Sequence, residues 1–263
     1  MHRWRLGPDI LVETDSVPLA RAIDLVYGRL RTAKPSAGNP PLFLAFDESL
    51  TIHCGGARVL RAESPSHLVP LVESMLDTFA GHVTRTKAVF HAGVLSVGGR
   101  GVLLSGESGA GKSTATLWLA QQGHEYFGDD LCFMDYETLS VEGLPKAATL
   151  KRGSFDLFPA SEIFADPVRG PVRYLLPPRV AGAEKTTALN ALIFPRYEKD
   201  SELRVSRIAK PLAALALVQQ SFLGVHREPR KLELVARLAE TPAWHVEYSR
   251  FADLERAVTE ALA

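Results

Sequence analysis

One eight-residue stretch, GESGAGKS at residues 106–113, limits the folds open to this chain more than any other feature. It matches the phosphate-binding loop pattern G-x-x-x-x-G-K-[ST], with Gly106, Gly111, Lys112 and Ser113 in place. The apolar VLLS before the loop is typical of a strand, and STATLWLAQQ after it is typical of a helix. A strand, a glycine-rich turn and a helix in this order predict an α/β fold with an anion site at the helix N-terminus.

Each residue type in this loop suits the binding of a nucleotide triphosphate. Glycines let backbone N–H groups turn inward around phosphate oxygens, which side chains would hinder. Lys112 would neutralise the β- and γ-phosphates, and the hydroxyl of Ser113 would ligate Mg²⁺. A chance glycine turn is the alternative, and the complete motif with its flanking strand and helix argues against it. We therefore predict ATP and Mg²⁺ as cofactors, bound by Gly106, Glu107, Ser108, Gly109, Ala110, Gly111, Lys112, Ser113 and Thr114.

Two adjacent carboxylates, Asp129 and Asp130, interrupt the apolar stretch FGDDLCF, which otherwise has the composition of a buried strand. Burying unpaired carboxylates side by side is costly, so the fold must offer them positive charge. A strand–helix–strand unit would return them to the phosphate-binding loop, next to Mg²⁺ and Lys112. One carboxylate would hold the metal and the other would accept a proton from an attacking hydroxyl. The alternative is an aspartate pair that only caps a turn after Gly128.

The composition of the chain indicates which classes of partner are not expected. Thirty basic and thirty acidic side chains give a formal charge of zero, so we expect no nucleic acid partner and no attraction to anionic membranes. The longest apolar block is too short to span a bilayer, and the N-terminus lacks the apolar core of a signal peptide. With only Cys54 and Cys132, a disulfide framework is not expected, and Cys132 is expected to pack rather than react. These features favour a soluble, cytoplasmic protein.

The chain is predicted to form two domains, an α+β subdomain at residues 1–86 and a kinase-like domain at 87–263. In the first, helices are expected at 16–30, after the start signals Ser16 and Pro18, and at 67–81, ending in a left-handed cap at Gly81. Strands are expected at 42–46 and 50–62, the latter folded into a hairpin at Gly55-Gly56, and a loop at 32–41.

In the second domain, the apolar stretch AVFHAGVLSVGGRGVLLS predicts strands joined by a glycine turn at 98–101. Further elements are a short helix at 154–165, a buried strand over Ala188–Phe194 and an edge strand at 244–248. Amphipathic helices are predicted at 210–224, 230–240 and 251–263.

The stretch HAGVLSVGGRGVLLSGESGAGKSTATLWLAQQGHEYFGDD, residues 91–130, resembles the core of the HPr kinase/phosphorylase family. Members of that family show a histidine-containing strand, a glycine turn, GxSGxGKS, a helix ending in Gly-His and an Asp-Asp pair. Here these are His91, the turn at 98–101, the loop at 106–113, Gly123-His124 and Asp129-Asp130. The intervals match without a gap, which is far more specific than a phosphate-binding loop alone.

The resemblance implies a P-loop kinase core shared with bacterial HPr kinases and phosphoenolpyruvate carboxykinases, a mixed twisted sheet with flanking helices that uses ATP and Mg²⁺. It implies that Asp130 is the base that deprotonates the acceptor hydroxyl, which leaves Asp129 with Ser113 for the metal. It also implies that His91 lies against the aspartates and orients them; the alternative is an ordinary hydrogen-bonded core histidine. The family tends to form homo-oligomers, so one is an expectation here.

This chain differs from the family pattern at positions that bear on metal binding, phosphate binding and the choice of acceptor. The family has a magnesium-binding Glu before Arg-Gly-Leu-Gly, whereas this chain has Lys151 before Arg152-Gly153. Arg196 is either the counterpart of a phosphate-binding arginine or a solvated arginine at a strand end. The region before residue 87 does not resemble the N-terminal domain of the longer HPr kinases, so HPr is not the expected acceptor.

The function predicted on this basis is an ATP- and Mg²⁺-dependent kinase. Its leading acceptor is a Ser of a peptide or protein other than HPr, followed by a small alcohol or sugar. The alternative is a non-catalytic ATP-sensing module, which the Lys151 substitution supports and the retained Asp pair and His91 oppose. A GTPase switch is disfavoured because the chain has no NKxD motif and no DxxG after the loop.

Overall fold

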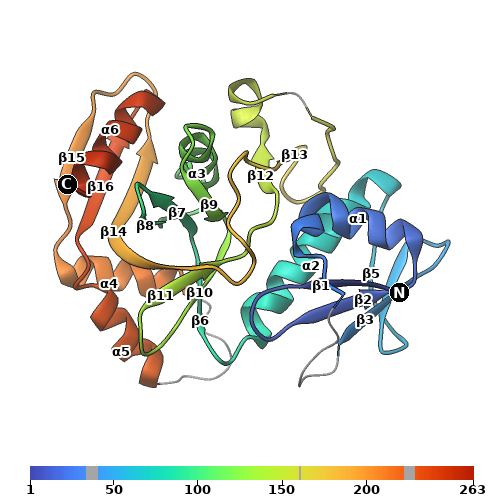
Figure 1. The fold of residues 1–263 in the computed structure, drawn as a ribbon. Coiled ribbons are helices and arrows are strands. Elements are labelled where there is room, and N and C mark those ends of the chain that lie inside the picture. The colour runs from blue at the N-terminus through green and yellow to red at the C-terminus, as the bar shows by residue number, and fades with distance from the viewer. Residues whose placement is uncertain (34–40, 160, 222–228) are drawn as a thin grey trace. The chain divides into compact units, whose positions relative to one another are not determined.

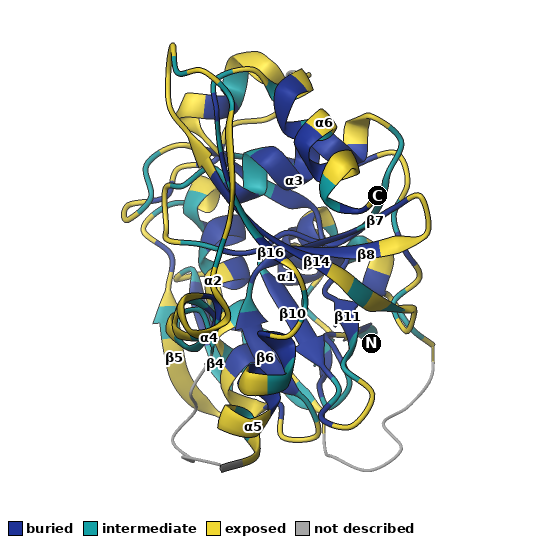
Figure 2. Cartoon of the chain, turned by 90° about the vertical axis from the view of Figure 1, so that its left-hand side faces the viewer, coloured by how far each residue is buried: buried dark blue, intermediate teal, exposed yellow. Residues whose placement is uncertain are grey.

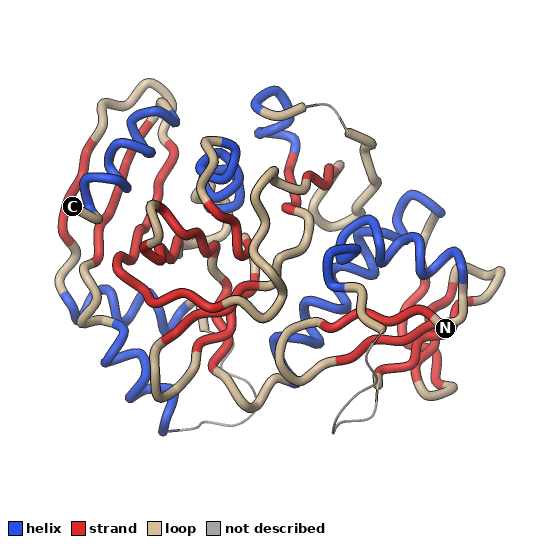
Figure 3. The backbone as a smooth tube through the Cα atoms, in the orientation of Figure 1, coloured by secondary structure: helices blue, strands red, loops and turns tan. Residues whose placement is uncertain are grey.

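The computed structural model describes residues 1–33, 41–159, 161–221 and 229–263. Its contacts divide the chain into two compact units (Figure 1). The smaller unit is Met1–Thr84 with Lys146–Leu176, and the larger is Arg85–Pro145 with Pro177–Ala263. Both mix strands, red in Figure 3, with helices, blue. The predicted domain boundary at 86/87 stays a prediction, and the second segment of the smaller unit was not anticipated.

The smaller unit is built on a sheet that contains five strands among the described residues, in the order β1-β2-β3-β4-β5. Two helices and a separate two-stranded sheet, β12-β13, complete it. Its elements are β1 (His2–Arg5), β2 (Leu11–Thr14), α1 (Val17–Tyr27), β3 (Leu42–Phe46), β4 (Thr51–Cys54), β5 (Ala57–Arg61), α2 (Leu68–Val83), β12 (Ala148–Lys151) and β13 (Val172–Leu175), with short 3-10 helices at Gly28–Leu30, Pro65–His67 and Arg152–Leu157.

The local start and turn signals of this unit act as the sequence predicts. Ser16 accepts a hydrogen bond from the backbone N–H of Leu19, which satisfies one of the free donors at the start of α1. The hairpin between β4 and β5 turns at Gly55 and Gly56, whose φ angles of 58° and 81° are those of a type I′ turn. Most of the predicted loop at 32–41 lies outside the described residues.

Two predictions for this unit are wrong. Gly81 does not cap α2 but lies buried inside it, because the helix continues to Val83. Thr84 ends the helix instead, and its hydroxyl donates to the carbonyl of Ala80 at 2.8 Å. The helix expected at 154–165 is only the 3-10 turn Arg152–Leu157, followed by irregular chain in the described residues.

A buried network of charges joins the two segments of the smaller unit. Glu73 of α2 is fully buried, and its carboxylate accepts hydrogen bonds from four side chains of the segment Lys146–Leu176. The donors are Lys146 Nζ (2.5 Å), Arg169 Nη2 (2.7 Å), Tyr174 Oη (2.9 Å) and Thr149 Oγ1. Burial alone would raise the pKa of Glu73, but the charges of Lys146 and Arg169 and these hydrogen bonds lower it below its usual value.

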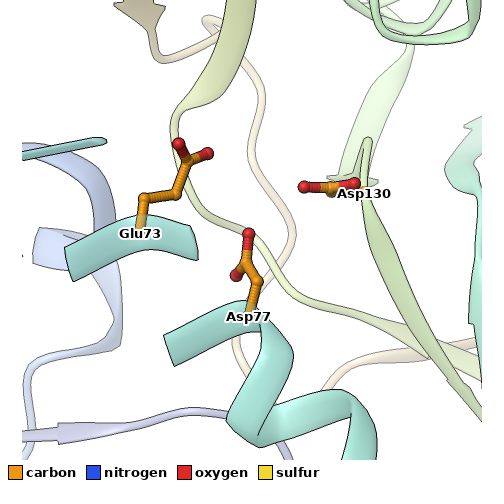
Figure 4. A group of neighbouring side chains, drawn as sticks. All are labelled: Glu73, Asp77 and Asp130. Carbon is orange, nitrogen blue, oxygen red and sulfur yellow. The ribbon is translucent and has the colours of Figure 1, made fainter. Parts of the chain in front are cut away.

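The next carboxylate on α2 extends this network. Asp77 stands one turn after Glu73 on the same side of the helix, as Figure 4 shows. Its carboxylate lies 2.7 Å from Lys146 Nζ and accepts a hydrogen bond from Tyr27 Oη at 2.7 Å. Lys146 is 1% exposed, so its ammonium is buried between two carboxylates. Such a group is tolerable only while both partners remain, because an unpaired buried charge is costly.

The larger unit is built on a mixed sheet that contains nine strands among the described residues. Its strands are β6 (Ala88–His91), β7 (Gly93–Val97), β8 (Arg100–Leu104), β9 (Glu125–Gly128), β10 (Leu131–Met134), β11 (Ser140–Gly143), β14 (Thr186–Tyr197), β15 (Arg204–Arg207) and β16 (Ala243–Tyr248). The order is β6-β10-β11-β14-β8-β7-β9, with β16 on β14 and β15 on β16. The predicted buried strand Ala188–Phe194 lies within β14, and the glycine turn before β8 is confined to Gly98-Gly99.

Strand direction sets which loops meet at one edge of this sheet. β14 runs parallel to β8, and β16 runs parallel to β14. β7 is antiparallel to both β8 and β9, so β8 and β9 also point the same way. The carboxyl ends of these four strands therefore share an edge. The prediction that residues 244–248 form an edge strand is wrong, because β15 pairs with β16 on its other side.

Four helices in the described residues flank this sheet, and they confirm the predicted α/β class. They are α3 (Lys112–Gln121), α4 (Lys210–Gln219), α5 (Pro229–Leu238) and α6 (Phe251–Ala261). α3 and the central strands are largely buried, dark blue in Figure 2, whereas α4 and α5 carry exposed positions in yellow. The end of the predicted helix 210–224 lies outside the described residues. Cys132 of β10 is fully buried, and burial raises the pKa of its thiol to about 12, so it packs as a neutral thiol.

Helices in the described part of the chain all lack the combination of length and apolar character that is needed to cross a bilayer.

Candidate functional site

The phosphate-binding loop connects β8 to α3, as its sequence predicts. Gly106, Gly109 and Gly111 have φ angles of 146°, 89° and 90°. These values are strained for residues with a Cβ, so the loop depends on glycine to turn its backbone. Helix α3 begins at Lys112 with Gly111 as its N-cap, and its first free N–H groups and positive dipole end therefore adjoin the loop.

Lys112 closes the loop on itself. Its side chain is largely buried, at 5% exposure, and Nζ donates to the carbonyls of Gly106 (2.7 Å) and Glu107 (3.0 Å). A cation hydrogen-bonded to the carbonyls of the loop is placed to meet an anion there. Of the other predicted loop residues, Glu107, Ser108 and Gly109 are exposed, and Gly106, Ala110, Gly111, Ser113 and Thr114 are partly buried.

The two aspartates form the turn between β9 and β10, so the stretch FGDDLCF is two strands rather than one. Asp129 is 2% exposed, and its Oδ1 accepts a hydrogen bond from Tyr126 Oη at 2.9 Å. Asp130, labelled in Figure 4, has a side chain that is 25% exposed. The pair is therefore divided into a buried carboxylate that Tyr126 holds and a more accessible one.

Gly128 lets this turn pack closely against the segment of the chain at Leu144. A Cβ on Gly128 would lie 2.8 Å from the carbonyl oxygen and 3.0 Å from the nitrogen of Leu144. Since both contacts are with backbone atoms, a side chain at residue 128 would push the turn away. A glycine directly before the aspartates thus serves close packing.

Asp130 is paired with His91 in the larger unit. Nδ1 of His91 lies 2.8 Å from Oδ1 of Asp130, and the two side chains are 40% and 25% exposed. The strands fix this contact, because His91 at the end of β6 stands opposite Leu131 at the start of β10. The backbone N–H of Ala92 also donates to the carbonyl of Asp130 at 3.1 Å. The imidazole is therefore placed to orient this carboxylate and to respond to its charge.

The sheet brings the aspartate turn and the phosphate-binding loop to the same edge. Gly93 of β7 pairs with Leu104, the last residue of β8, and the adjacent Val94 pairs with Gly128, the last residue of β9. Only β7 separates the two strand ends, so they stand about 10 Å apart at the usual strand spacing. The loop leaves one of these ends and the aspartates leave the other.

These residues suit the binding of Mg²⁺ and ATP. The loop offers three glycines with positive φ angles, the N-terminus of a helix and a buried lysine, which together form an anion-binding set. A Cβ at Gly109 would meet open space, so room remains over the loop. The hydroxyl of Ser113 and the carboxylates of Asp129 and Asp130 are hard oxygen ligands of the kind Mg²⁺ prefers.

The remaining predicted residues lie elsewhere. Arg196 is near the carboxyl end of β14, its side chain is 60% exposed, and its Nη2 is 3.8 Å from Glu198 Oε2. This is the environment of a solvated arginine, although the strand end belongs to the edge that carries the loop. Lys151 and Arg152 are exposed residues of the smaller unit.

Sequence reasoning did not identify Tyr126 as a functional residue. Its hydroxyl fixes Asp129, and it stands three residues before that aspartate, near the start of β9. The available signal was a tyrosine in a short strand that leads to two carboxylates, since a buried tyrosine hydroxyl needs a partner.

Comparisons with known proteins identify the same region. Residues 83–149 match the family model described as HPr Serine kinase C-terminal domain. Proteins described as HPr kinase/phosphorylase from Burkholderia cenocepacia (strain HI2424) and Burkholderia mallei (strain SAVP1) are each 25% identical over 132 residues. The match covers 46% of this chain and 41% of each relative, so the chain corresponds to less than half the length of those relatives.

A solved structure, that of the Hpr(Ser) kinase/phosphatase from Coxiella burnetii, matches 65% of this chain and 94% of its own, at 15% identity and a TM-score of 0.31. The family model spans His91, the phosphate-binding loop and the Asp129-Asp130 turn together. The resemblance noted in the sequence is therefore confirmed: residues 83–149 are similar to the C-terminal domain of HPr Serine kinases.

Proposed function

We propose that the larger unit is a phosphotransferase that moves the γ-phosphoryl group of ATP to a hydroxyl acceptor. The observation that carries this proposal is the shared sheet edge, at which the phosphate-binding loop and the Asp129-Asp130 turn leave strands on either side of β7. Phosphoryl transfer needs a phosphate cradle and a base at short range, and little other covalent chemistry from the protein.

The proposed roles follow from exposure and contacts. Asp130, the more accessible aspartate, accepts the proton of the acceptor hydroxyl, and His91 holds its carboxylate in place. The acceptor oxygen forms a bond to the γ-phosphorus, the bond from that phosphorus to the β,γ-bridging oxygen breaks, and ADP leaves with the electron pair. Lys112 and the N–H groups of Gly109–Gly111 offset the charge on the transferring phosphoryl oxygens.

Asp129 and Ser113 are the proposed ligands of Mg²⁺. Mg²⁺, when bound, supplies positive charge to the β- and γ-phosphates. Tyr126 restrains Asp129 by donating a hydrogen bond to Oδ1 of its carboxylate. Arg196 is retained as a candidate phosphate contact because β14 ends at the edge that carries the loop.

The acceptor that we favour is a serine hydroxyl of a peptide or protein other than HPr. The relatives carry the name HPr kinase/phosphorylase, but they match this chain over only 41% of their length. The smaller unit, with its sheet and two helices, is the part of the chain that the matched region leaves largely uncovered. We assign acceptor recognition to it. A small alcohol or sugar is the second acceptor class.

A non-catalytic ATP-sensing module is the competing function. It is favoured by Lys151, which stands where the family has a magnesium-binding glutamate. A module that only senses ATP needs no general base, so the pairing of His91 with Asp130 weighs against this function.

Label transfer separates these functions. Wild-type protein and Lys112→Ala would be incubated with γ-labelled ATP, Mg²⁺ and a fractionated extract of the source organism. The kinase predicts label in a protein, peptide or metabolite fraction with the wild type alone, and the fraction identifies the acceptor class. ATP binding by the wild type without label in any fraction would favour the sensing module.

A further inference from the structure

Four aromatic residues of the larger unit gather beside the phosphate-binding loop. Three of them stand at element ends: Tyr197 ends β14, Tyr248 ends β16, and Phe251 begins α6. Trp118 of α3 completes the group, with its ring centroid 5.0 Å from that of Phe251. α6 packs against both β16 and α3, which brings the rings together.

These rings adjoin the loop itself. The backbone N–H of Tyr197 donates to the carbonyl of Ala110 at 3.4 Å, so the end of β14 is attached to the loop. A Cβ placed on Gly111 would lie 3.5 Å from the Cβ of Tyr197 and 3.8 Å from the hydroxyl of Tyr248. The Tyr197 side chain thus starts beside Gly111, the N-cap residue of α3.

The rings differ in exposure, and this gives the group a supported outer surface. Tyr197 is 46% exposed, whereas Tyr248 is fully buried. The ring of Tyr197 stacks on Phe251 with centroids 5.9 Å apart and planes 15° apart. Tyr248 meets both rings edge-on, at 5.8 Å from Tyr197 and 5.4 Å from Phe251. Two other rings therefore brace the exposed ring of Tyr197.

The Tyr248 hydroxyl has no hydrogen-bond partner among the described residues, although it is buried. Its ring packing, rather than a hydrogen bond, therefore holds Tyr248 in place. Burial, followed by the nearby Tyr197, raises the pKa of Tyr248, so the residue stays neutral and adds no charge to this surface. The exposed ring of Tyr197, which its neighbours hold in place, therefore offers a flat, neutral surface on which another aromatic ring can stack.

We propose that Tyr197, braced by Phe251 and Tyr248, stacks against the purine base of the nucleotide whose phosphates occupy the loop. The inference rests on the proposed binding of ATP and adds a base-binding surface to it. A nucleotide anchored by its β- and γ-phosphates at Gly109–Ser113 carries its base beyond the loop, at the end of the α-phosphate and the ribose. Tyr197, whose backbone N–H donates to Ala110, places an exposed aromatic ring beside the loop to meet that base. A purine offers a larger π face than a pyrimidine, so the surface favours purines.

The test compares three probes on folded full-length protein: MgATP, MgCTP and Mg-tripolyphosphate, which has phosphates but no base. Tyr197→Ala is expected to weaken MgATP binding by about tenfold, the scale of one lost base–aromatic stack, and to reduce the preference for MgATP over MgCTP. Tripolyphosphate binding is expected to stay unchanged, which also shows that the loop has folded. Tyr197→Phe keeps the ring and should restore MgATP affinity.

Val205→Ala is the matched control, because it removes another exposed apolar side chain from a strand of the same unit. It should change none of the three affinities. Equal MgATP affinity in Tyr197→Ala and wild type, or an equal loss for MgATP and tripolyphosphate, would overturn the base-binding surface and leave the proposed function standing. Wild-type protein that binds neither MgATP nor tripolyphosphate would overturn both.

Discussion

Nδ1 of His91 lies 2.8 Å from Oδ1 of Asp130, although the two residues are separated by the whole strand–loop–helix unit that carries the phosphate-binding loop. The contact exists because β6 and β10 are paired with His91 opposite Leu131. The histidine–carboxylate pair and the anion-binding loop therefore belong to the same unit of the protein.

Loss of His91 should affect phosphoryl transfer more than nucleotide binding. His91→Ala removes the group that orients Asp130, so the transfer rate is expected to fall by about tenfold, as for a base that loses its position but not its chemistry. His91→Gln, which can still hydrogen-bond the carboxylate, should recover part of the rate. Single-turnover transfer and the Kd of MgATP would be measured on each variant; a tenfold loss of MgATP affinity without a rate change would assign His91 to binding instead.

Lys112 is expected to be essential for holding the triphosphate. Its ammonium is buried and hydrogen-bonded to the loop carbonyls of Gly106 and Glu107, and it would exchange these contacts for phosphate oxygens. Lys112→Ala should weaken MgATP by about 100-fold, the scale of a lost hydrogen bond to a charged group. Titration calorimetry measures the change. Unaltered affinity in a folded Lys112→Ala protein would remove the loop from the nucleotide site.

Removing one partner from the buried charge network of the smaller unit should strongly destabilise the protein. Glu73→Gln removes the charge that offsets Lys146 and Arg169, so the unfolding free energy is expected to fall by about 3–5 kcal/mol at neutral pH. Asp24→Asn is the control: it disrupts the ion pair with Arg31, whose side chains are 33% and 47% exposed, and should cost about 1 kcal/mol or less. Denaturant unfolding distinguishes the two costs.

The same network predicts how the unfolding free energy changes with pH. The pKa of Glu73 is lowered in the folded protein, so the unfolded chain binds more protons as the pH falls through 4.5, the usual pKa of a glutamate. The stability from this carboxylate is therefore fully present above that pH and is lost as the pH falls through the folded-state value. The gap in unfolding free energy between wild type and Glu73→Gln should narrow below about pH 4.5. A gap that stays constant down to acid unfolding would contradict the assignment.

Close packing at the aspartate turn gives a further prediction. A Cβ on Gly143 would lie 2.1 Å from the carbonyl oxygen of Phe127, two residues before Asp129. Gly143→Ala must displace β9 or β11, and it should destabilise the protein by about 1–3 kcal/mol and reduce phosphoryl transfer. Gly28→Ala is the matched change, since a Cβ there meets nothing within 4 Å and its φ is −56°. Thermal unfolding should separate the two variants, and equal Tm values would refute the packing argument.

The features that the sequence predicted best are those that a short segment determines. The phosphate-binding loop, the strand before it and the helix after it depend on adjacent residues, such as Gly111 and Lys112, and they form as expected. The start of α1 at Ser16 and the hairpin at Gly55-Gly56 follow for the same reason.

Features that depend on distant contacts were missed. Gly81 is a helix-ending residue by propensity, yet it is buried within α2, since tertiary packing overrides a preference of about 1 kcal/mol. Glu73 and Lys146 meet across 73 positions, and no local pattern links them. The different burial of Asp129 and Asp130 likewise depends on Tyr126 and on the strand break, neither of which two adjacent letters reveal.

The measurement that tests the account most directly is phosphoryl transfer by Asp130→Asn, compared with its MgATP affinity. The asparagine keeps the size of the side chain and removes the proton acceptor. With γ-labelled ATP and the extract fraction that accepts label from the wild type, transfer should fall by at least ~100-fold, the usual scale of a lost general base, while the Kd of MgATP changes less than about threefold. Transfer retained at the wild-type rate would contradict the role of Asp130 as the base.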